Sequence, residues 1–137
     1  MVLSGCLDVI GPDTGPALRP SCTGIDSDPG TDIDFTRDIH SGIFERPSIN
    51  CVACHTARGA TPIGLTVGGL DLSTSATLRA GGIHGGASII VAGDPCASIL
   101  VQKLTAPPFG ARMPLNGPAL APADVQTIVD WIAEGAR

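Results

Sequence analysis

The sequence predicts an all-α fold that follows an irregular N-terminal extension. Apolar residues recur at helical spacing in residues 35–44 and 122–134, and the only strand-like run, residues 88–92, is short. The 18 Gly and 12 Pro together supply 30 of the 137 residues, so the helices are expected to be short and joined by long loops. Because only 3% of the residues are aromatic, such a chain buries little apolar surface by itself. We therefore expect a large apolar group to complete the core.

The segment most informative about chemistry contains two cysteines and a histidine at C-x-x-C-H spacing. It reads Cys51-Val52-Ala53-Cys54-His55. This spacing is the attachment motif of a c-type haem, in which each thiol forms a thioether bond to the same porphyrin. The imidazole that follows then lies beneath the iron and binds it as the proximal ligand. We expect a single covalently attached haem c, because the chain has no internal repeat.

Two other uses of this motif are a redox C-x-x-C pair and half of a zinc site. A zinc site needs a second pair of ligands at similar spacing. Beyond Cys54 the chain has one cysteine, Cys96, and the histidines outside the motif, His40 and His84, stand alone. The sequence has no basic patch that would indicate nucleic-acid binding, and no apolar run of the roughly 18 residues that a membrane helix needs. Haem attachment remains the best interpretation.

Charge divides the chain into a leader, residues 1–34, and a domain, residues 35–137. The net charge of −5 lies in the leader, which has six acidic residues against Arg19 alone, whereas the domain has seven acidic and seven basic residues. Residues 26–34 alternate carboxylates as a calcium loop does, but Gly30 takes a ligand position of the EF-hand pattern. We expect a solvated acidic linker that can attract a basic redox partner.

Three cysteines remain outside the motif, namely Cys6, Cys22 and Cys96. Residues 3–6, LSGC, look like a bacterial lipobox that directs lipidation of Cys6, although only five residues precede it. Cys22 and Cys96 would then form a disulfide, which contributes roughly 4 kcal/mol in the chain-entropy model. A Cys6–Cys22 bridge with Cys96 free is the competing layout, and we favour Cys22–Cys96. Haem c and disulfides both indicate an extracytoplasmic location, in the periplasm, at the outer membrane or outside the cell, with membrane contact only if Cys6 is lipidated.

Three short helical segments are expected in the first half of the domain. The first begins near Asp34, which can cap it, and ends near Phe44. A single helical turn after Asn50 carries the haem motif. After a loop rich in Gly and Thr, Ser73 is expected to cap a helix over residues 74–80.

Two further helices are expected near the C-terminus. Asp94 as a cap and Pro95 at the first helical position predict a helix that ends near Thr105. A Pro-rich loop then leads to the clearest helix of the chain, from about Pro122 to Glu134. Its apolar stripe consists of Val125, Ile128, Val129 and Ile132.

Several segments resemble those of small bacterial cytochrome c domains. They are Leu70-Asp71-Leu72, Gly93-Asp94-Pro95, Arg112-Met113-Pro114 and the ending Asp130-Trp131-Ile132-Ala133-Glu134-Gly135-Ala136. Over about residues 35–137 the pattern looks like the cytochrome c-like domains of planctomycete and myxobacterial secreted proteins and lipoproteins. The resemblance implies a class I cytochrome c fold, in which the terminal helices cross and Phe35, Phe44 and Trp131 meet. Cys96 and the Gly-rich loop at residues 81–86 depart from the family pattern.

The resemblance also implies that Met113 lies in the loop that supplies the distal ligand of the haem iron. A thioether opposite an imidazole favours ferrous iron and raises the reduction potential relative to two histidines. Filling of the core is the ordinary alternative role of a methionine. His84 is the rival ligand, because its glycine-flanked loop can bring the imidazole to the iron.

The expected function is one-electron transfer to and from redox partner proteins, and not enzymatic catalysis. One alternative is a subunit of an extracellular electron-conducting assembly, in which Cys6 and Cys22 of the extension link copies of the chain. A haem peroxidase is a second alternative, but it needs an open distal site, which a bound Met113 would close. A haem gas sensor suits the chain less well, because no output domain accompanies the haem motif.

Overall fold

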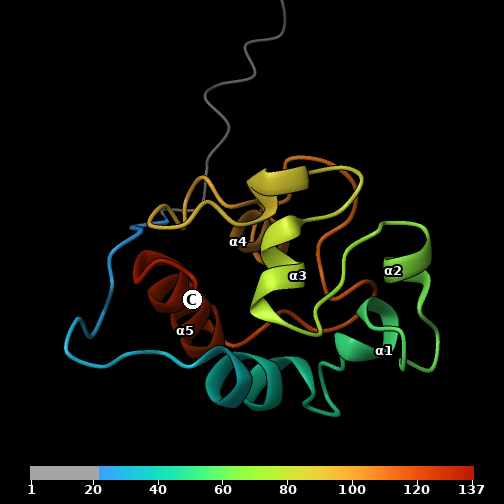
Figure 1. The fold of residues 1–137 in the computed structure, drawn as a ribbon, viewed down its shortest axis with the longest axis horizontal. Helices are drawn as coiled ribbons and strands as arrows, with labels where there is room; N and C mark the ends of the chain where they lie inside the picture. Colours follow the sequence, from blue (N-terminus) through green and yellow to red (C-terminus); the bar gives the residue numbers. More distant parts are fainter. Residues whose placement is uncertain (1–21) are drawn as a thin grey trace, which may run out of the picture.

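The computed structural model describes residues 22–137, and this part of the chain is helical and free of strands, as the sequence predicts (Figure 1). Its helices, in chain order, are η1 (Phe35–Phe44), α1 (Val52–His55), α2 (Ile63–Thr66), α3 (Ser75–Ala80), η2 (Gly86–Ile89), α4 (Ile99–Leu104) and α5 (Pro122–Ala133). Within residues 22–137, none of the helices has the length and apolar character needed to span a bilayer. The lipidation expected at Cys6 falls outside the described residues.

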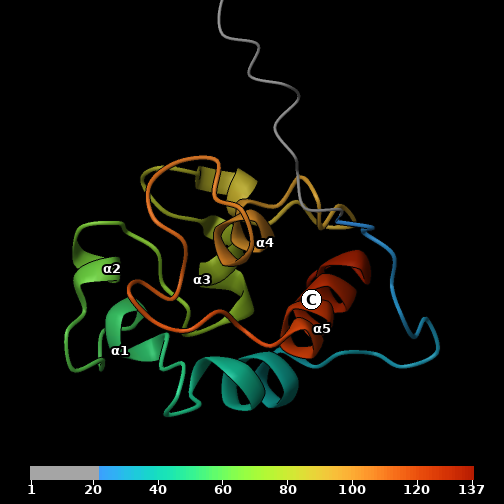
Figure 2. The same ribbon diagram turned by 180° about the vertical axis from the view of Figure 1, so that it is seen from behind.

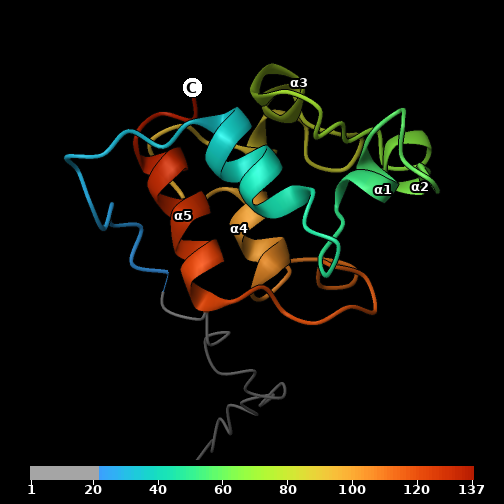
Figure 3. The same cartoon turned by 90° about the horizontal axis from the view of Figure 1, so that it is seen from below.

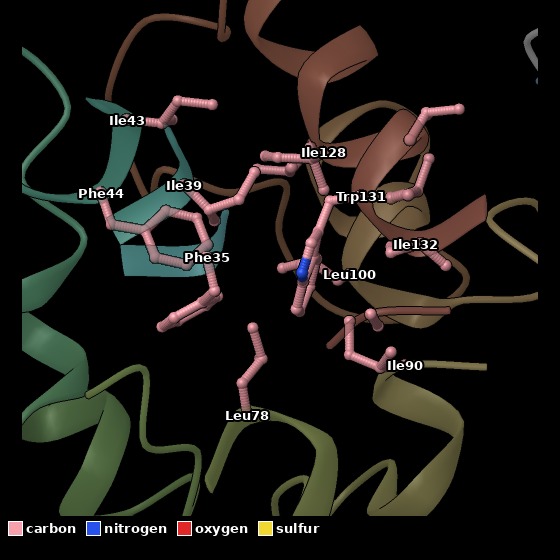
Figure 4. Close-up of a cluster of buried hydrophobic side chains, with 14 of the residues drawn as sticks. Phe35, Ile39, Ile43, Phe44, Leu78, Ile90, Leu100, Ile128, Trp131 and Ile132 are labelled. Atoms are coloured by element: carbon pink, nitrogen blue, oxygen red, sulfur yellow. The ribbon is translucent and has the colours of Figure 1, made fainter. Parts of the chain in front are cut away.

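The core forms where η1 crosses α5. Figure 3 shows the two helices packed together, and Figure 4 shows their apolar side chains meeting between them. The ring centroid of Phe35 lies 5.3 Å from that of Trp131 and 6.3 Å from that of Phe44, the second pair in an edge-to-face arrangement. All three side chains are buried. Large buried rings in such geometry contribute strongly to core stability, and the three residues meet as the resemblance implied.

The first helix has the expected bounds but is a π-helix. Asp34 caps it, since its carboxylate accepts a hydrogen bond from the Arg37 N–H at 2.7 Å. At its end the Glu45 N–H donates to the His40 carbonyl at 2.9 Å, the five-residue spacing of a π-helix. Helical periodicity in a sequence predicts the apolar face of such a helix but does not distinguish π from α hydrogen bonding.

Two helices begin later than the sequence suggested. Thr74, and not Ser73, caps α3, and it forms a reciprocal capping box with Thr77. Asp94 does not start α4 but closes a preceding turn, and α4 itself begins at Ile99. An acidic cap followed by proline is equally suited to a turn and to a helix start, so the local signal was ambiguous.

Two single-turn elements lie where none was expected. The loop after the haem motif contains α2, and the strand-like run at residues 88–92 begins within the 3₁₀ turn η2. Both turns contain glycine, which disfavours helix, so tertiary contacts rather than propensity hold them. In contrast, α5 has Pro122 at its first position and ends at Ala133, within one residue of the expected bounds.

Residues 22–34, which we call the N-terminal strap, run past α5 before entering η1 (Figure 1). The strap begins with a disulfide between Cys22 and Cys96, the pairing favoured from the sequence. Midway, the Ser27 hydroxyl and N–H donate to the Asp130 carboxylate at 2.6 and 2.9 Å. Most strap side chains are exposed, as expected for a solvated linker, but these bonds fix its backbone to the domain.

Asp130 is the buried acceptor that joins the strap to α5. Its side chain also accepts a hydrogen bond from the Gln126 amide at 2.6 Å, and the residue is only 6% exposed. We expect Asp130→Ala to lower the free energy of unfolding by about 2 kcal/mol, because hydrogen bonds to a charged acceptor are lost and buried donors are left unpaired. Asp130→Asn should lower the free energy of unfolding by less, since the Ser27 hydroxyl can accept a hydrogen bond from the new amide. Urea denaturation of both variants measures this, and equal losses would argue against a specific carboxylate role.

Candidate functional site

The haem motif forms one helical turn. α1 begins directly after Cys51, and the His55 N–H donates to the Cys51 carbonyl at 3.0 Å. Because residues three apart in a helical turn share one side, Cys51 and Cys54 lie on the same side of this turn. Both thiols are free and half-buried, and burial raises the pKa of the Cys51 thiol to about 11. Two adjacent thiols on one turn are what two thioether bonds to one porphyrin require.

The imidazole of His55 is oriented by a backbone carbonyl. Its Nδ1 lies 3.2 Å from the Leu70 carbonyl oxygen, and the His55 carbonyl accepts the Leu72 N–H at 2.9 Å. When Nδ1–H donates to Leu70, the lone pair of Nε2 is available to a metal. Burial lowers the pKa of His55, and the Leu70 carbonyl opposes this shift. A neutral imidazole with a fixed tautomer is the form that ligates iron.

Glycines allow the loop after the motif to fold back onto it. A Cβ atom on Gly59 would overlap the backbone carbonyls of Val52 and Ala53. A Cβ atom on Gly64 would lie 2.6 Å from Nδ1 and 2.7 Å from Nε2 of His55. α2, which carries Gly64, therefore packs directly against the imidazole. Sequence reasoning noted the glycine-rich loop but could not tell which glycine touches the motif.

We expect Gly64→Ala to destabilise the site by about 1–3 kcal/mol, the usual range for overpacking, because the methyl group must displace the His55 ring. Guanidinium unfolding of the haem-loaded protein measures the loss. Gly30→Ala is the matched control, since its Cβ would meet only the Asp28 carboxylate at 3.6 Å. Equal free energies of unfolding for the two variants would show that a methyl group at position 64 does not disturb the His55 ring.

The residues around α1 fit a covalently held haem. The donor set comprises two thiols and an imidazole with Nε2 available for iron. Half-buried apolar side chains adjoin the core on this side of the molecule, among them Ile49, Val52 and Leu70. Among residues 22–137 no group of three or more metal-binding side chains lies close enough together to form a zinc site. Two thiols and one imidazole on a single turn are the donors that covalent attachment of a haem requires.

The two candidate distal ligands, Met113 and His84, lie in different environments. Met113 lies in the loop between α4 and α5, which extends toward α1 before it returns (Figure 2). Its side chain is half-buried and packs against the hydrophobic core. His84 is exposed in the glycine-rich turn before η2. His40 lies on η1, where its ring approaches the Glu45 carboxylate at 3.5 Å.

The part of the chain that contains this site also matches a known protein family. A family model described as planctomycete cytochrome C matches residues 51–124, which is 74 of the 137 residues. The chain belongs to the planctomycete cytochrome c family. The matched region starts at the haem motif of this cytochrome and ends in the first turn of α5. No curated protein and no solved structure matches the chain.

Family membership confirms the all-α, cytochrome c-like fold predicted from the sequence. It also implies haem c as the cofactor and haem-based electron transfer as the chemistry of the domain. The matched region includes Met113 as well as the motif.

Proposed function

We propose that this cytochrome carries single electrons outside the cytoplasm, with haem c attached to Cys51 and Cys54 and ligated by His55 and Met113. The observation that carries the proposal is the His55 ring, whose Nδ1 faces the Leu70 carbonyl at 3.2 Å, on the same helical turn as the two free thiols Cys51 and Cys54. Haem supplies the one-electron chemistry, since its iron changes between the ferric and ferrous states.

The chain's own residues set the conditions for that chemistry. Cys51 and Cys54 anchor the porphyrin edge and fix it relative to α1. The Leu70 carbonyl holds the imidazole in one tautomer and orientation, which raises its basicity toward iron. Met113, as a thioether, favours the ferrous state and so raises the reduction potential. With both His55 and Met113 bound to it, the haem iron would have no position free for substrate, which suits an electron carrier better than a peroxidase.

The contrast between Met113 and His84 supports the choice of distal ligand. A ligand bond that survives electron transfer needs a side chain that is already near its bound position. Met113 packs against the core and its backbone is hydrogen-bonded to α4, whereas His84 is exposed among glycines. Ordering His84 at the iron would therefore cost more conformational entropy.

Intact-mass measurement and optical spectroscopy of the haem-loaded protein test this proposal. The mass is expected to exceed that of the polypeptide by one haem, and the haem is expected to stay attached after acid–acetone extraction. The ferric protein is expected to show the weak far-red charge-transfer band of a methionine–iron bond. An extractable haem would overturn covalent attachment, and absence of the band at neutral pH would overturn Met113 as the ligand.

The proposal includes a basic redox partner protein, attracted by acidic side chains of the strap such as Asp26, Asp28 and Asp32. We expect the rate of electron transfer to a basic redox protein to fall as salt rises, because screening weakens attraction between exposed charges. Stopped-flow mixing at about 10 and 150 mM ionic strength measures the effect. Asp28→Asn with Asp32→Asn, at two exposed positions, should reduce the salt dependence, and an unchanged dependence would place the docking surface elsewhere.

A further inference from the structure

The loop that carries Met113 contains no helix or strand of its own. It spans residues 105–121 and contains four prolines and two glycines. A loop of this length loses much conformational entropy when it is ordered, so it needs specific bonds to keep one conformation. The structure supplies such bonds from two cationic side chains.

Lys103, the only lysine of the chain, holds the loop through both its side chain and its backbone. Its ammonium donates to the carbonyls of Phe109 and Ala111 at 2.7 and 2.9 Å. The same ammonium lies 4.7 Å from the centre of the Phe109 ring, within cation–π range. Its backbone carbonyl accepts the N–H of Met113 at 2.8 Å. Lys103 therefore fixes the chain just before Met113 and also the Met113 backbone itself.

Arg112 acts within the loop on the other side of Met113. Its guanidinium donates to the carbonyls of Met113 and Gly117 at 3.2 and 2.9 Å. Arg112 therefore stiffens the loop internally. Lys103 instead ties the loop to α4, a helix anchored in the core by Leu100, Val101 and Leu104. Of these two cationic side chains, Lys103 is the one that connects the loop to a helix of the core.

We propose that Lys103 is a positioning residue for the distal ligand, which holds the Met113 loop against α4 so that the thioether is presented to the iron. This inference rests on the proposed His55/Met113 ligation. A neutral thioether is a weak ligand in competition with external donors, and preordering its loop reduces the entropy lost when the bond to iron forms. Without the ammonium, the Phe109 and Ala111 carbonyls lose their donors and the loop opens more readily.

Titration of the ferric, haem-loaded protein with imidazole tests this role, because imidazole can bind the iron only when Met113 leaves. We expect Lys103→Leu to bind imidazole with a dissociation constant about tenfold lower than that of the wild type, together with a weaker far-red band. Arg79→Leu is the matched control, since it removes one exposed cation from α3, and it should change the dissociation constant less than twofold. Lys103→Arg should lie closer to the wild type than Lys103→Leu does, because a guanidinium keeps the positive charge and several N–H donors.

The outcomes separate the two proposals. A wild-type protein with the far-red band, and a Lys103→Leu variant that binds imidazole as the wild type does, would overturn the role of Lys103 and leave Met113 ligation intact. A wild-type protein without the band would overturn both. If Lys103→Leu does not take up haem, Lys103→Gln, which removes the charge and keeps one donor group, is titrated in its place. Hydrogen exchange of the Met113 amide gives a second readout, expected to accelerate in either neutral variant and not in Arg79→Leu.

Discussion

Replacing Cys22 and Cys96 together by serine is expected to lower the free energy of unfolding by about 4 kcal/mol. The disulfide joins residues 74 positions apart. In the chain-entropy model, a cross-link over that length lowers the conformational entropy of the unfolded chain, and the loss corresponds to a free energy of about 4 kcal/mol. Ordinary domains have total stabilities of only about 5–15 kcal/mol. The loss would therefore be a large part of the stability of a chain with few aromatic residues and many loops.

Guanidinium unfolding of the haem-loaded protein measures this effect, and chemical reduction of the wild type should reproduce it. A matched control is the pair Thr23→Ser and Ala97→Ser, which places the same residue type at exposed neighbouring positions and leaves the bridge intact. Because the disulfide and Asp130 hold the same strap, their losses should not add when the variants are combined. An unfolding midpoint equal to that of the control would show that the bridge does not stabilise the fold.

The parts of the structure that were predicted correctly depend on local signals. α5 combines an apolar stripe, a proline at its first position and a glycine beyond its end, and each signal acts within the helix itself. The haem motif requires only two thiols and an imidazole at fixed spacing, which a helical turn after Cys51 satisfies automatically. The crossing of η1 and α5 came from the family resemblance, because no local pattern tells which helices pack together.

The contacts that the sequence did not predict are made by backbone atoms or by residues distant in sequence. The Leu70 carbonyl orients His55, but every residue has a carbonyl, so no residue type marks it. No local pattern marks Asp130 as buried, and its partner Ser27 lies 103 residues earlier in the chain. Lys103 lies in the helix predicted to end near Thr105, but no local pattern marks the loop carbonyls that its ammonium contacts. Such partners are determined by tertiary packing, which sequence patterns do not encode locally.

Met113→Ala is expected to produce the largest change at the haem. The ferric variant should lose the far-red band, its reduction potential should fall, and external imidazole should bind about a hundredfold more tightly. The last effect follows because an intramolecular ligand competes at a high effective concentration, whose removal changes apparent affinity by at least this factor. The fall in potential follows because a thioether stabilises ferrous iron relative to water or imidazole.

Leu115→Ala is the control for this variant, because Leu115 lies two residues further along the same loop and its side chain is 58% exposed. It should leave the spectrum, the potential and imidazole binding unchanged. If His84 were the distal ligand, Met113→Ala would keep the wild-type spectrum and His84→Ala would change it. With Met113 as the ligand, imidazole affinity should rise in the order wild type, Lys103→Leu, Met113→Ala, since Lys103→Leu weakens the Met113–iron bond and Met113→Ala abolishes it. In the Met113→Ala background, Lys103→Leu should have no further effect on imidazole binding, because the loop then has no ligand to position.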